Sequence, residues 1–287
     1  MTERRQAPLS TRATPSGPVP GEDGLRERLR GHLLRLSLND LDERIDAYLD
    51  AAVKDRPSYL QLLENVLGDA AARRREQRIE YGFANSGLKV PKSLAAFDWD
   101  FQPKLDRALV EDIATLHFVA QHEDVLFTGK SGTGKSHILQ ALVLKACEKE
   151  INVRYARAAD LLDDLYAGLA DGTYERRLKA WCRPDLLVID DVGLGQVKRR
   201  DDEPTAAHTL FNLLDRRHTR ASTAVTSNIK LSAWGKYLGD ATLAAAILDR
   251  LIMNAIRIDI DGPSFRQHVA RQRSQASGGP DIDPLET

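Results

Sequence analysis

Hydrophobic residues recur at helical spacing through three segments near the start of the chain. The first two cover residues 25–36 and 38–52, where apolar side chains stand three or four positions apart. A third helix is predicted to begin after Ser58, because Ser58 and Gln61 have the spacing of a capping box. We therefore expect a small helical domain over residues 23–85. A linker is expected at the helix-breaking residues Gly82, Asn85, Gly87 and Pro91.

Strand patterns alternate with helix patterns from residue 97 to about residue 260. The run at 186–189 is apolar without interruption, as in a strand that is buried on both faces of a sheet. This alternation predicts an α/β fold over residues 86–271, with a parallel sheet between helices. The predicted strands cover residues 125–128, 151–155, 186–189 and 223–227, and the last predicted helix covers residues 242–255.

The two ends of the chain show neither pattern. Residues 1–20 combine prolines with Ser, Thr and Gly, and the residues after about 272 are rich in Ser, Gly, Pro and Asp. Such segments bury too little apolar surface to offset the entropy lost on folding. We expect a disordered arm over residues 1–22 and a disordered tail over residues 272–287.

The composition fits a globular protein with one large and one small domain. The chain has 287 residues, of which 42% are hydrophobic. Its 41 basic and 42 acidic residues give a net charge of -1, so affinity for nucleic acid has to come from local patches. Neither a run of about 18 apolar residues nor a secretory signal is visible, which predicts a cytoplasmic protein without membrane contact. Cys147 and Cys182 are expected to be reduced thiols and not a disulfide or a metal site.

One glycine-rich segment carries the strongest chemical signal. It follows the predicted strand at 125–128, precedes an apolar helix, and fits the phosphate-binding pattern G-x-x-x-x-G-K-[ST]. Its glycines let backbone N–H groups point at phosphate oxygens, where a Cβ would block the approach. Lys135 is expected to reach the β- and γ-phosphates of a nucleoside triphosphate, and Ser136 to ligate Mg²⁺. The segment consists of Gly129, Lys130, Ser131, Gly132, Thr133, Gly134, Lys135 and Ser136.

Two carboxylates follow the apolar run at 186–189. Asp190 and Asp191 would stand at the carboxyl end of a buried strand, where ligands of open α/β sheets bind. Four apolar residues before two acids are a weak signal alone, since many strands run into acidic turns. The signal gains weight beside a phosphate-binding loop, because a triphosphate site needs an acidic partner for its metal. We predict that Asp190 holds the Mg²⁺ shell and that Asp191 polarises the attacking water.

Three further polar residues are candidates for this site. Asn228 ends the predicted strand at 223–227, where its amide could orient the lytic water, although Asn is also common in turns. Arg250 lies on an apolar helix and could act as an arginine finger in the site of a neighbouring subunit. Arg266 could contact the γ-phosphate in its own subunit. For both arginines, a solvated surface position is the alternative.

The order of these motifs resembles that of the IstB family of AAA+ ATPases, which are relatives of the DnaC helicase loaders. The resemblance covers about residues 24–272 and includes the lead-in at 93–99 ahead of the first strand. It implies an ATP-driven helper of an insertion-sequence transposase, which assembles on DNA as an oligomer and hydrolyses ATP in response to the transposase. It assigns sensor one to Asn228, the finger acting in trans to Arg250 and sensor two to Arg266. Many AAA+ enzymes have Glu where Asp191 stands, which implies slow hydrolysis until a partner tightens the site.

Clusters of basic residues are candidates for contacts with double-stranded DNA. They have no base-reading pattern, so binding is expected to be independent of DNA sequence and strongly dependent on salt. A solvated helix face or loop is the alternative for each cluster. The basic run at 198–200 departs from the IstB pattern, and its role is open. The candidates are Arg73, Arg74, Arg75, Arg78, Arg176, Arg177, Lys179, Lys198, Arg199 and Arg200.

Other functions are compatible with this sequence. A replicative helicase loader has the same nucleotide site and a helicase as its partner in place of the transposase. A nucleotide-gated DNA-binding scaffold would bind ATP and hardly hydrolyse it. A small-molecule kinase fits less well, because no segment resembles a lid over an acceptor substrate, and Arg250 and Arg266 suit an oligomeric ATPase better.

Overall fold

The structure is a computed structural model that describes residues 21–194 and 205–276. The chain forms two compact units, Met1–Arg75 and Glu76–Thr287. The predicted arm up to residue 20 and the predicted tail beyond residue 276 lie outside the described residues. The same holds for the basic residues Lys198, Arg199 and Arg200.

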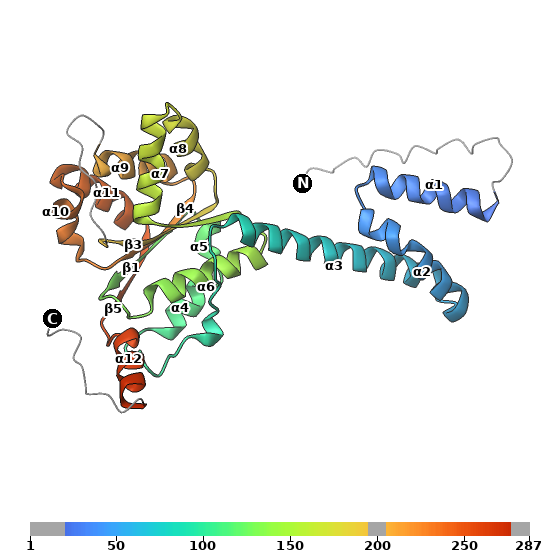
Figure 1. Cartoon of the computed structure of the whole chain (residues 1–287), viewed down its shortest axis with the longest axis horizontal. Coiled ribbons are helices and arrows are strands. Elements are labelled where there is room, and N and C mark those ends of the chain that lie inside the picture. Colours follow the sequence, from blue (N-terminus) through green and yellow to red (C-terminus); the bar gives the residue numbers. More distant parts are fainter. Residues whose placement is uncertain (1–20, 195–204, 277–287) are drawn as a thin grey trace, which may run out of the picture. The chain divides into compact units, whose positions relative to one another are not determined.

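Three helices make up the described part of the first unit (Figure 1). They are α1 (Glu22–Arg35), α2 (Asn39–Asp55) and the amino-terminal part of α3 (Tyr59–Asn85). Their apolar stripes meet in a small core, as the helical spacing of the leucines predicts. The buried residues of this core are Leu33, Leu41, Ile45 and Val66.

Helix α3 begins where the capping pattern predicts. The hydroxyl of Ser58 accepts a hydrogen bond from the N–H of Gln61 at 3.2 Å. The helix then continues through Gly82 to Asn85, so the prediction that Gly82 ends the helical pattern is wrong. A Cβ at Gly82 would lie 3.9 Å from the sulfur of Cys147. This position therefore faces the packed interior of the second unit, and packing overrides the weak helix propensity of glycine.

The second unit is built on a parallel sheet of five strands in the order β2-β3-β4-β1-β5. Every pairing in the sheet is parallel. The carboxyl ends of β1, β3 and β4 therefore lie side by side at one edge of the sheet, where ligands of such folds bind. The strands are β1 (Asp124–Gly129), β2 (Val153–Arg157), β3 (Leu186–Val192), β4 (Ser222–Ser227) and β5 (Ala255–Ile260).

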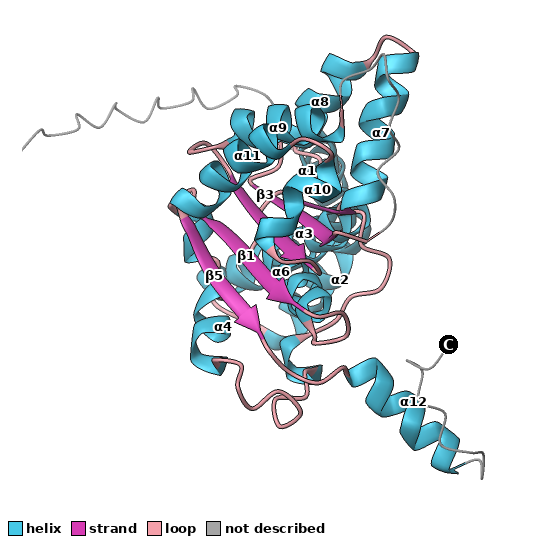
Figure 2. Cartoon of the chain, turned by 90° about the vertical axis from the view of Figure 1, so that its left-hand side faces the viewer, coloured by secondary structure: helices cyan, strands magenta, loops and turns pink. Residues whose placement is uncertain are grey.

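Helices cover both faces of this sheet, which confirms the predicted α/β fold (Figure 2). One group of helices, together with the carboxyl-terminal end of α3, packs on one face around residues such as Phe127 and Leu142, and a second group packs on the other around residues such as Leu161 and Leu213. The first group is α4 (Arg107–Ile113), α5 (His117–Ala120) and α6 (Lys135–Glu148). The second is α7 (Ala158–Ala170), α8 (Tyr174–Cys182), α9 (Ala206–Arg217), α10 (Trp234–Leu238) and α11 (Ala241–Met253). A last helix, α12 (Phe265–Ala276), follows β5.

Several boundaries differ from those predicted. Strand β2 begins at Val153, two residues late, because Val153 pairs with the first residue of β3. The helix predicted up to residue 255 ends at Met253, and the following strand β5 was not predicted. Helix α12 continues to Ala276, so the tail predicted from residue 272 begins too early.

The two cysteines are free thiols, as predicted: Cys147 is buried in α6, and Cys182 is half-buried at the end of α8. Within the described ranges, no helix is both long and apolar enough to span a bilayer.

Candidate nucleotide site

The glycine-rich segment connects β1 to α6 at the carboxyl edge of the sheet. Gly129, Gly132 and Gly134 have φ values of +142°, +84° and +100°, which glycine adopts without strain. A Cβ at Gly134 would lie 2.6 Å from the Phe97 ring, and a Cβ at Gly132 would lie 2.1 Å from the Ser264 hydroxyl. Glycine is therefore required at both places by backbone conformation and by space. The resulting turn can point N–H groups at an anion, as phosphate-binding nests do.

The start of α12 is fastened to this loop. The N–H of Phe265 donates to the carbonyl oxygen of Gly132 at 2.9 Å. The side-chain amide of Gln102 donates to the carbonyl oxygen of Pro263 at 2.9 Å. These contacts bring Arg266, in the first turn of α12, to the cavity that the loop also lines.

A cavity of about 400 Å³ lies against the loop. Its lining combines polar groups of the loop and of the strand ends with aromatic rings, so phosphates and a stacked base both find suitable surfaces there. Besides the loop, the lining residues include Phe97, Phe101, Gln102, Asp191, Asn228, Phe265 and Arg266.

Lys135 is buried at the first turn of α6. Its ammonium group donates to the carbonyl oxygens of Gly129 and Lys130, each at 2.7 Å. Burial lowers the pKa of Lys135 to about 8, against the opposing effect of Asp191 and Asp190. The side chain therefore remains mostly charged at neutral pH, and the phosphates of a nucleotide would hold the proton more firmly.

Asp190 lies at the carboxyl end of β3 with 1% of its surface exposed. Its Oδ1 accepts hydrogen bonds from the Ser136 hydroxyl at 2.9 Å, the Asp191 N–H at 3.0 Å and the Thr226 hydroxyl. Its Oδ2 accepts from the Tyr155 hydroxyl at 2.7 Å. Donors on several separate segments thus fix the orientation of this carboxylate.

Asp191 has a strained backbone, with φ of +63°. Its N–H donates to the Thr226 hydroxyl at 2.8 Å, and the pairing of β3 with β4 shifts register between Ile189 and Val192. Such an irregularity changes the direction of a side chain at the end of a strand. Here the Asp191 carboxylate accepts a hydrogen bond from the Asn228 amide at 3.0 Å, and both side chains line the cavity.

Tyr155 contacts Asp190 at this site, although no sequence pattern predicted it. This residue pairs with Val188 across β2 and β3, so it is the diagonal neighbour of Asp190 on the same face of the sheet. Burial, and then the charge of Asp190, raise the pKa of the tyrosine hydroxyl, which keeps it protonated as a donor. An aromatic residue in a strand is usually core, and the sequence contains no signal that would single this one out.

The oxygen atoms at this site fit a magnesium ion. Mg²⁺ prefers carboxylate, hydroxyl and phosphate oxygens. The Ser136 hydroxyl and the Asp190 carboxylate provide two such groups in direct contact with each other, next to the loop that fits a phosphate.

Arg250 does not line the cavity of its own chain. Its guanidinium donates to Asp215 at 2.7 Å and to the carbonyl oxygen of Ala246 at 3.2 Å. It also lies over the Phe211 ring, 4.5 Å from the centroid. The structure therefore separates Arg250 from the other predicted site residues and ties it to α9.

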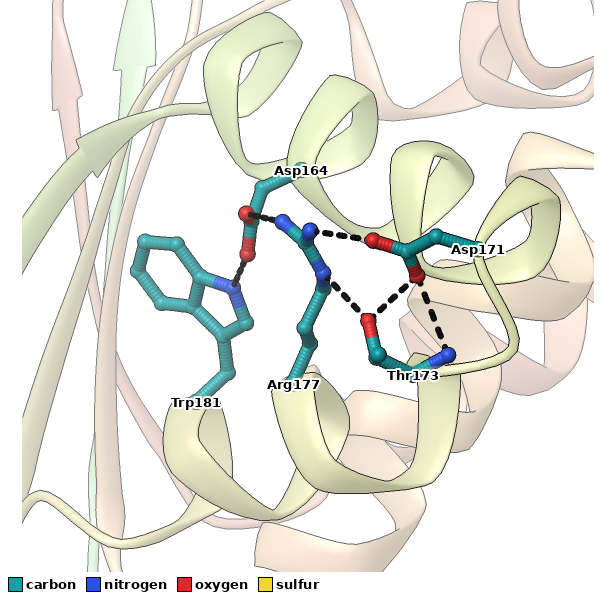
Figure 3. A network of polar contacts seen from close by, with 5 residues as sticks. All are labelled: Asp164, Asp171, Thr173, Arg177 and Trp181. Atoms are coloured by element: carbon teal, nitrogen blue, oxygen red, sulfur yellow. Dashed lines mark hydrogen bonds and ion pairs between the residues drawn. The ribbon is translucent and has the colours of Figure 1, made fainter.

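Arg177, a predicted DNA contact, is occupied by partners on α7 and on the turn before α8 (Figure 3). It forms ion pairs with Asp164 and Asp171 and donates to the Thr173 hydroxyl at 2.8 Å. Asp164 also accepts a hydrogen bond from the Trp181 indole at 2.7 Å. Arg177 therefore links α7 to α8, and its guanidinium is already occupied by these partners. It is not one of the proposed DNA contacts.

The other described basic candidates lie on exposed helix faces. Arg176 and Lys179 are exposed on α8, and Arg74, Arg75 and Arg78 on α3, with Arg73 half-buried. Arg78 forms an ion pair with Glu150 at 2.9 Å. Such an exposed pair contributes little stability and leaves the arginine available to another anion.

Comparisons with known proteins identify relatives of this chain. Residues 31–276 match the model of the family described as IstB-like ATP binding protein. An ATP-binding protein of insertion sequence IS21 from Pseudomonas aeruginosa is 32% identical, over 84% of this chain and 89% of its own length. An ATP-binding protein of insertion sequence IS5376 from Geobacillus stearothermophilus is 29% identical, over 88% of this chain and 98% of its own length.

A solved structure agrees on the fold. AMPPCP-bound DnaA from Aquifex aeolicus has a TM-score of 0.50 and 20% sequence identity, and the match covers 70% of this chain and 57% of that one. The shared architecture is the AAA+ P-loop fold. With a family match that spans both units, this chain belongs to the IstB-like ATP-binding proteins of insertion sequences.

Proposed function

We propose that the protein is a Mg²⁺-dependent ATPase that assists the transposase of an insertion sequence on DNA. One observation carries the ATPase assignment. Lys135, Ser136, Asp190, Asp191 and Asn228 come from separate parts of the sequence and meet at the carboxyl ends of three neighbouring strands. Four of them line one cavity, and the fifth, Asp190, contacts Ser136 of that cavity.

Each side chain has a distinct role in the proposed reaction. Lys135 binds the β- and γ-phosphates, and Ser136 and Asp190 hold Mg²⁺, which would neutralise the charge that develops on the phosphates. Asp191 accepts the proton of the attacking water, and Asn228, hydrogen-bonded to Asp191, orients that water. Arg266 contacts the γ-phosphate from the rim of the cavity.

We propose that a second subunit completes this site through Arg250. An arginine finger accelerates hydrolysis by about 10³–10⁵ where it operates. Arg250 is held by Asp215 in its own chain, with 29% of its side chain exposed, and it would exchange this partner for a γ-phosphate when subunits assemble. Together with the short carboxylate of Asp191, this predicts slow hydrolysis by the isolated subunit.

DNA and a transposase are the proposed partners. The matched relatives are named as insertion-sequence proteins, and an insertion sequence moves by cutting and joining DNA. The exposed basic faces of α3 and α8 suit a phosphate backbone and offer no pattern for reading bases. We therefore expect binding to double-stranded DNA that is independent of sequence and promoted by ATP.

Phosphate release by the purified protein tests this proposal, with ATP and Mg²⁺ alone and then with DNA and the transposase of the same insertion sequence. We expect the rate to rise with each addition. Lys135→Ala should lose ATP binding, and Asp191→Asn should bind ATP without hydrolysing it. Absence of phosphate release under every combination would contradict the ATPase assignment and favour a DNA-binding scaffold. Stimulation by a replicative helicase in place of the transposase would contradict the assigned partner.

A further inference from the structure

A second hollow, of about 590 Å³, lies along the edge strand β2. We call it the β2 hollow. It is distinct from the nucleotide cavity, and Lys92 lines both. Four of its lining side chains are cationic, and the acidic side chain among them is Asp160. The cations are Lys89, Lys92, Arg154 and Arg157.

The wall of the β2 hollow is held in a fixed conformation. The carbonyl oxygen of Ser86 accepts a hydrogen bond from the N–H of Tyr155 at 2.6 Å, which fastens the segment after α3 to the edge strand. Gly87 has φ of +82°, and a Cβ there would lie 2.7 Å from the carbonyl oxygen of Tyr155. Leu88 is then buried in the core. This docking places Lys89 beside the arginines of β2.

The cations of the β2 hollow have few protein partners. The Arg154 guanidinium stacks on the Trp181 ring, 3.3 Å from its centroid, on the same indole that donates to Asp164. Lys89, Lys92 and Arg157 form no ion pair with any residue that the structure describes. A folded protein gains nothing from crowding unpaired like charges, since their repulsion is unfavourable. An anion bound in the hollow would reduce this repulsion.

We infer that the β2 hollow binds the phosphate backbone of double-stranded DNA. This inference rests on the proposed function and adds a contact surface for DNA to the basic faces of α3 and α8. Phosphate tracking needs cations on a rigid surface, and an open hollow along a strand edge can accept a continuous chain. An acidic peptide is the weaker fit, because peptide recognition depends on apolar anchors in pockets. Leu88 and Trp181 are already buried, which leaves Val90 as the exposed large apolar side chain of the hollow.

Charges on an edge strand have another known use, which is to prevent pairing with other sheets. Arg154 and Arg157 would prevent such pairing even if DNA bound elsewhere on the protein. Lys89 does not belong to the strand, so its presence in the same hollow favours a shared ligand. A double variant at Lys89 and Arg157 therefore tests whether the hollow binds a ligand.

The test is DNA affinity measured against salt concentration, with ATP present, for the double variant Lys89→Gln, Arg157→Gln. Each lost phosphate contact lowers the salt slope by about 0.9, so the slope should fall by about 2 and affinity by roughly 50-fold at about 0.1 M salt. The matched control is Lys236→Gln, Arg220→Gln, which removes two exposed cations elsewhere in the second unit and should bind like the wild type. The charge-keeping variant Lys89→Arg, Arg157→Lys should also bind.

The outcomes separate this inference from the proposed function. If the wild type binds DNA and the glutamine variant binds equally well, the hollow is not the DNA site, and the proposed function stands. If the glutamine variant keeps its DNA affinity and loses only stimulation by the transposase, the occupant is a protein and the inference is wrong. If the wild type fails to bind DNA, both are wrong. Unchanged melting temperature and ATP affinity establish that the variants are folded, and the single variants replace the pair if it unfolds.

Discussion

Replacing Tyr155 with Phe tests whether the hydroxyl on Asp190 contributes to the reaction. The change removes one oxygen, 2.7 Å from Oδ2 of Asp190, and leaves the ring among its hydrophobic neighbours. A hydrogen bond to a charged group contributes about 1.5–3 kcal/mol. Asp190 keeps its other donors on Oδ1, so we expect a loss near the lower end of this range. At about 1.4 kcal/mol for each factor of ten, this corresponds to roughly a tenfold lower rate.

Phosphate release at saturating ATP, measured across a range of Mg²⁺ concentrations with DNA and transposase present, gives this rate. We expect a lower maximal rate and a higher Mg²⁺ requirement, because the carboxylate proposed to hold the metal loses the contact that orients Oδ2. ATP binding without Mg²⁺ should stay unchanged, since the phosphates are proposed to contact Lys135 and the loop. A merely structural role for the hydroxyl would lower the melting temperature and leave the Mg²⁺ requirement alone.

The chain offers a matched control for this variant. Tyr48 donates its hydroxyl to the carboxylate of Asp69 in the first unit, so Tyr48→Phe removes the same kind of bond from a place outside the nucleotide site. If the Tyr155 variant and the Tyr48 variant hydrolyse ATP equally at every Mg²⁺ concentration, the reasoning about Asp190 is refuted.

Three other predictions follow from the geometry. Gly87→Ala should lower the free energy of unfolding by at least about 1 kcal/mol more than Gly172→Ala in denaturant titrations, because both glycines have positive φ and only Gly87 faces a backbone oxygen; equal losses would contradict the docking. On the proposed role of Lys135, ATP affinity should be nearly constant from neutral pH to pH 8 and fall by up to about tenfold per pH unit above it, because the phosphates would bind the charged form of Lys135 and raise its pKa from about 8. Calorimetry at alkaline pH should accordingly detect proton uptake on binding, and its absence would argue against this assignment. Arg250→Ala should bind ATP with low turnover, and equal mixing with Lys135→Ala should restore activity if the finger acts in trans; no rescue would indicate a role within one subunit.

The phosphate loop and the acids of β3 could be predicted from the sequence because their chemistry depends on local order. Three glycines, a lysine and a serine at fixed spacing specify the turn, and the apolar run before Asp190 specifies a buried strand. Asn228 was predicted for the same reason, as the polar end of the next strand. The structure then brings Asn228 and Asp191 into hydrogen-bonding contact.

Residues placed by tertiary packing could not be predicted in this way. Tyr155 reaches Asp190 only because β2 pairs with β3 in one register, and no local pattern specifies that pairing. The charge of Arg177 was visible in the sequence, but its partners Asp164 and Asp171 become neighbours only when α7 packs on α8. Strand β5 was overlooked although Ile256, Ile258 and Ile260 alternate with less apolar residues, as in a half-buried edge strand.

The tryptophans of this chain give it a set of built-in optical reporters. Trp99 packs on Phe97 with ring centroids 4.7 Å apart. The Phe97 ring in turn lies against Gly134 of the phosphate loop. Trp181 lies in the β2 hollow, and the third, Trp234, is fully buried. The emission of Trp99 should therefore respond to nucleotide and that of Trp181 to DNA, while Trp234 provides a constant background. Two ligands can thus be followed in the unlabelled protein by replacing one indole at a time.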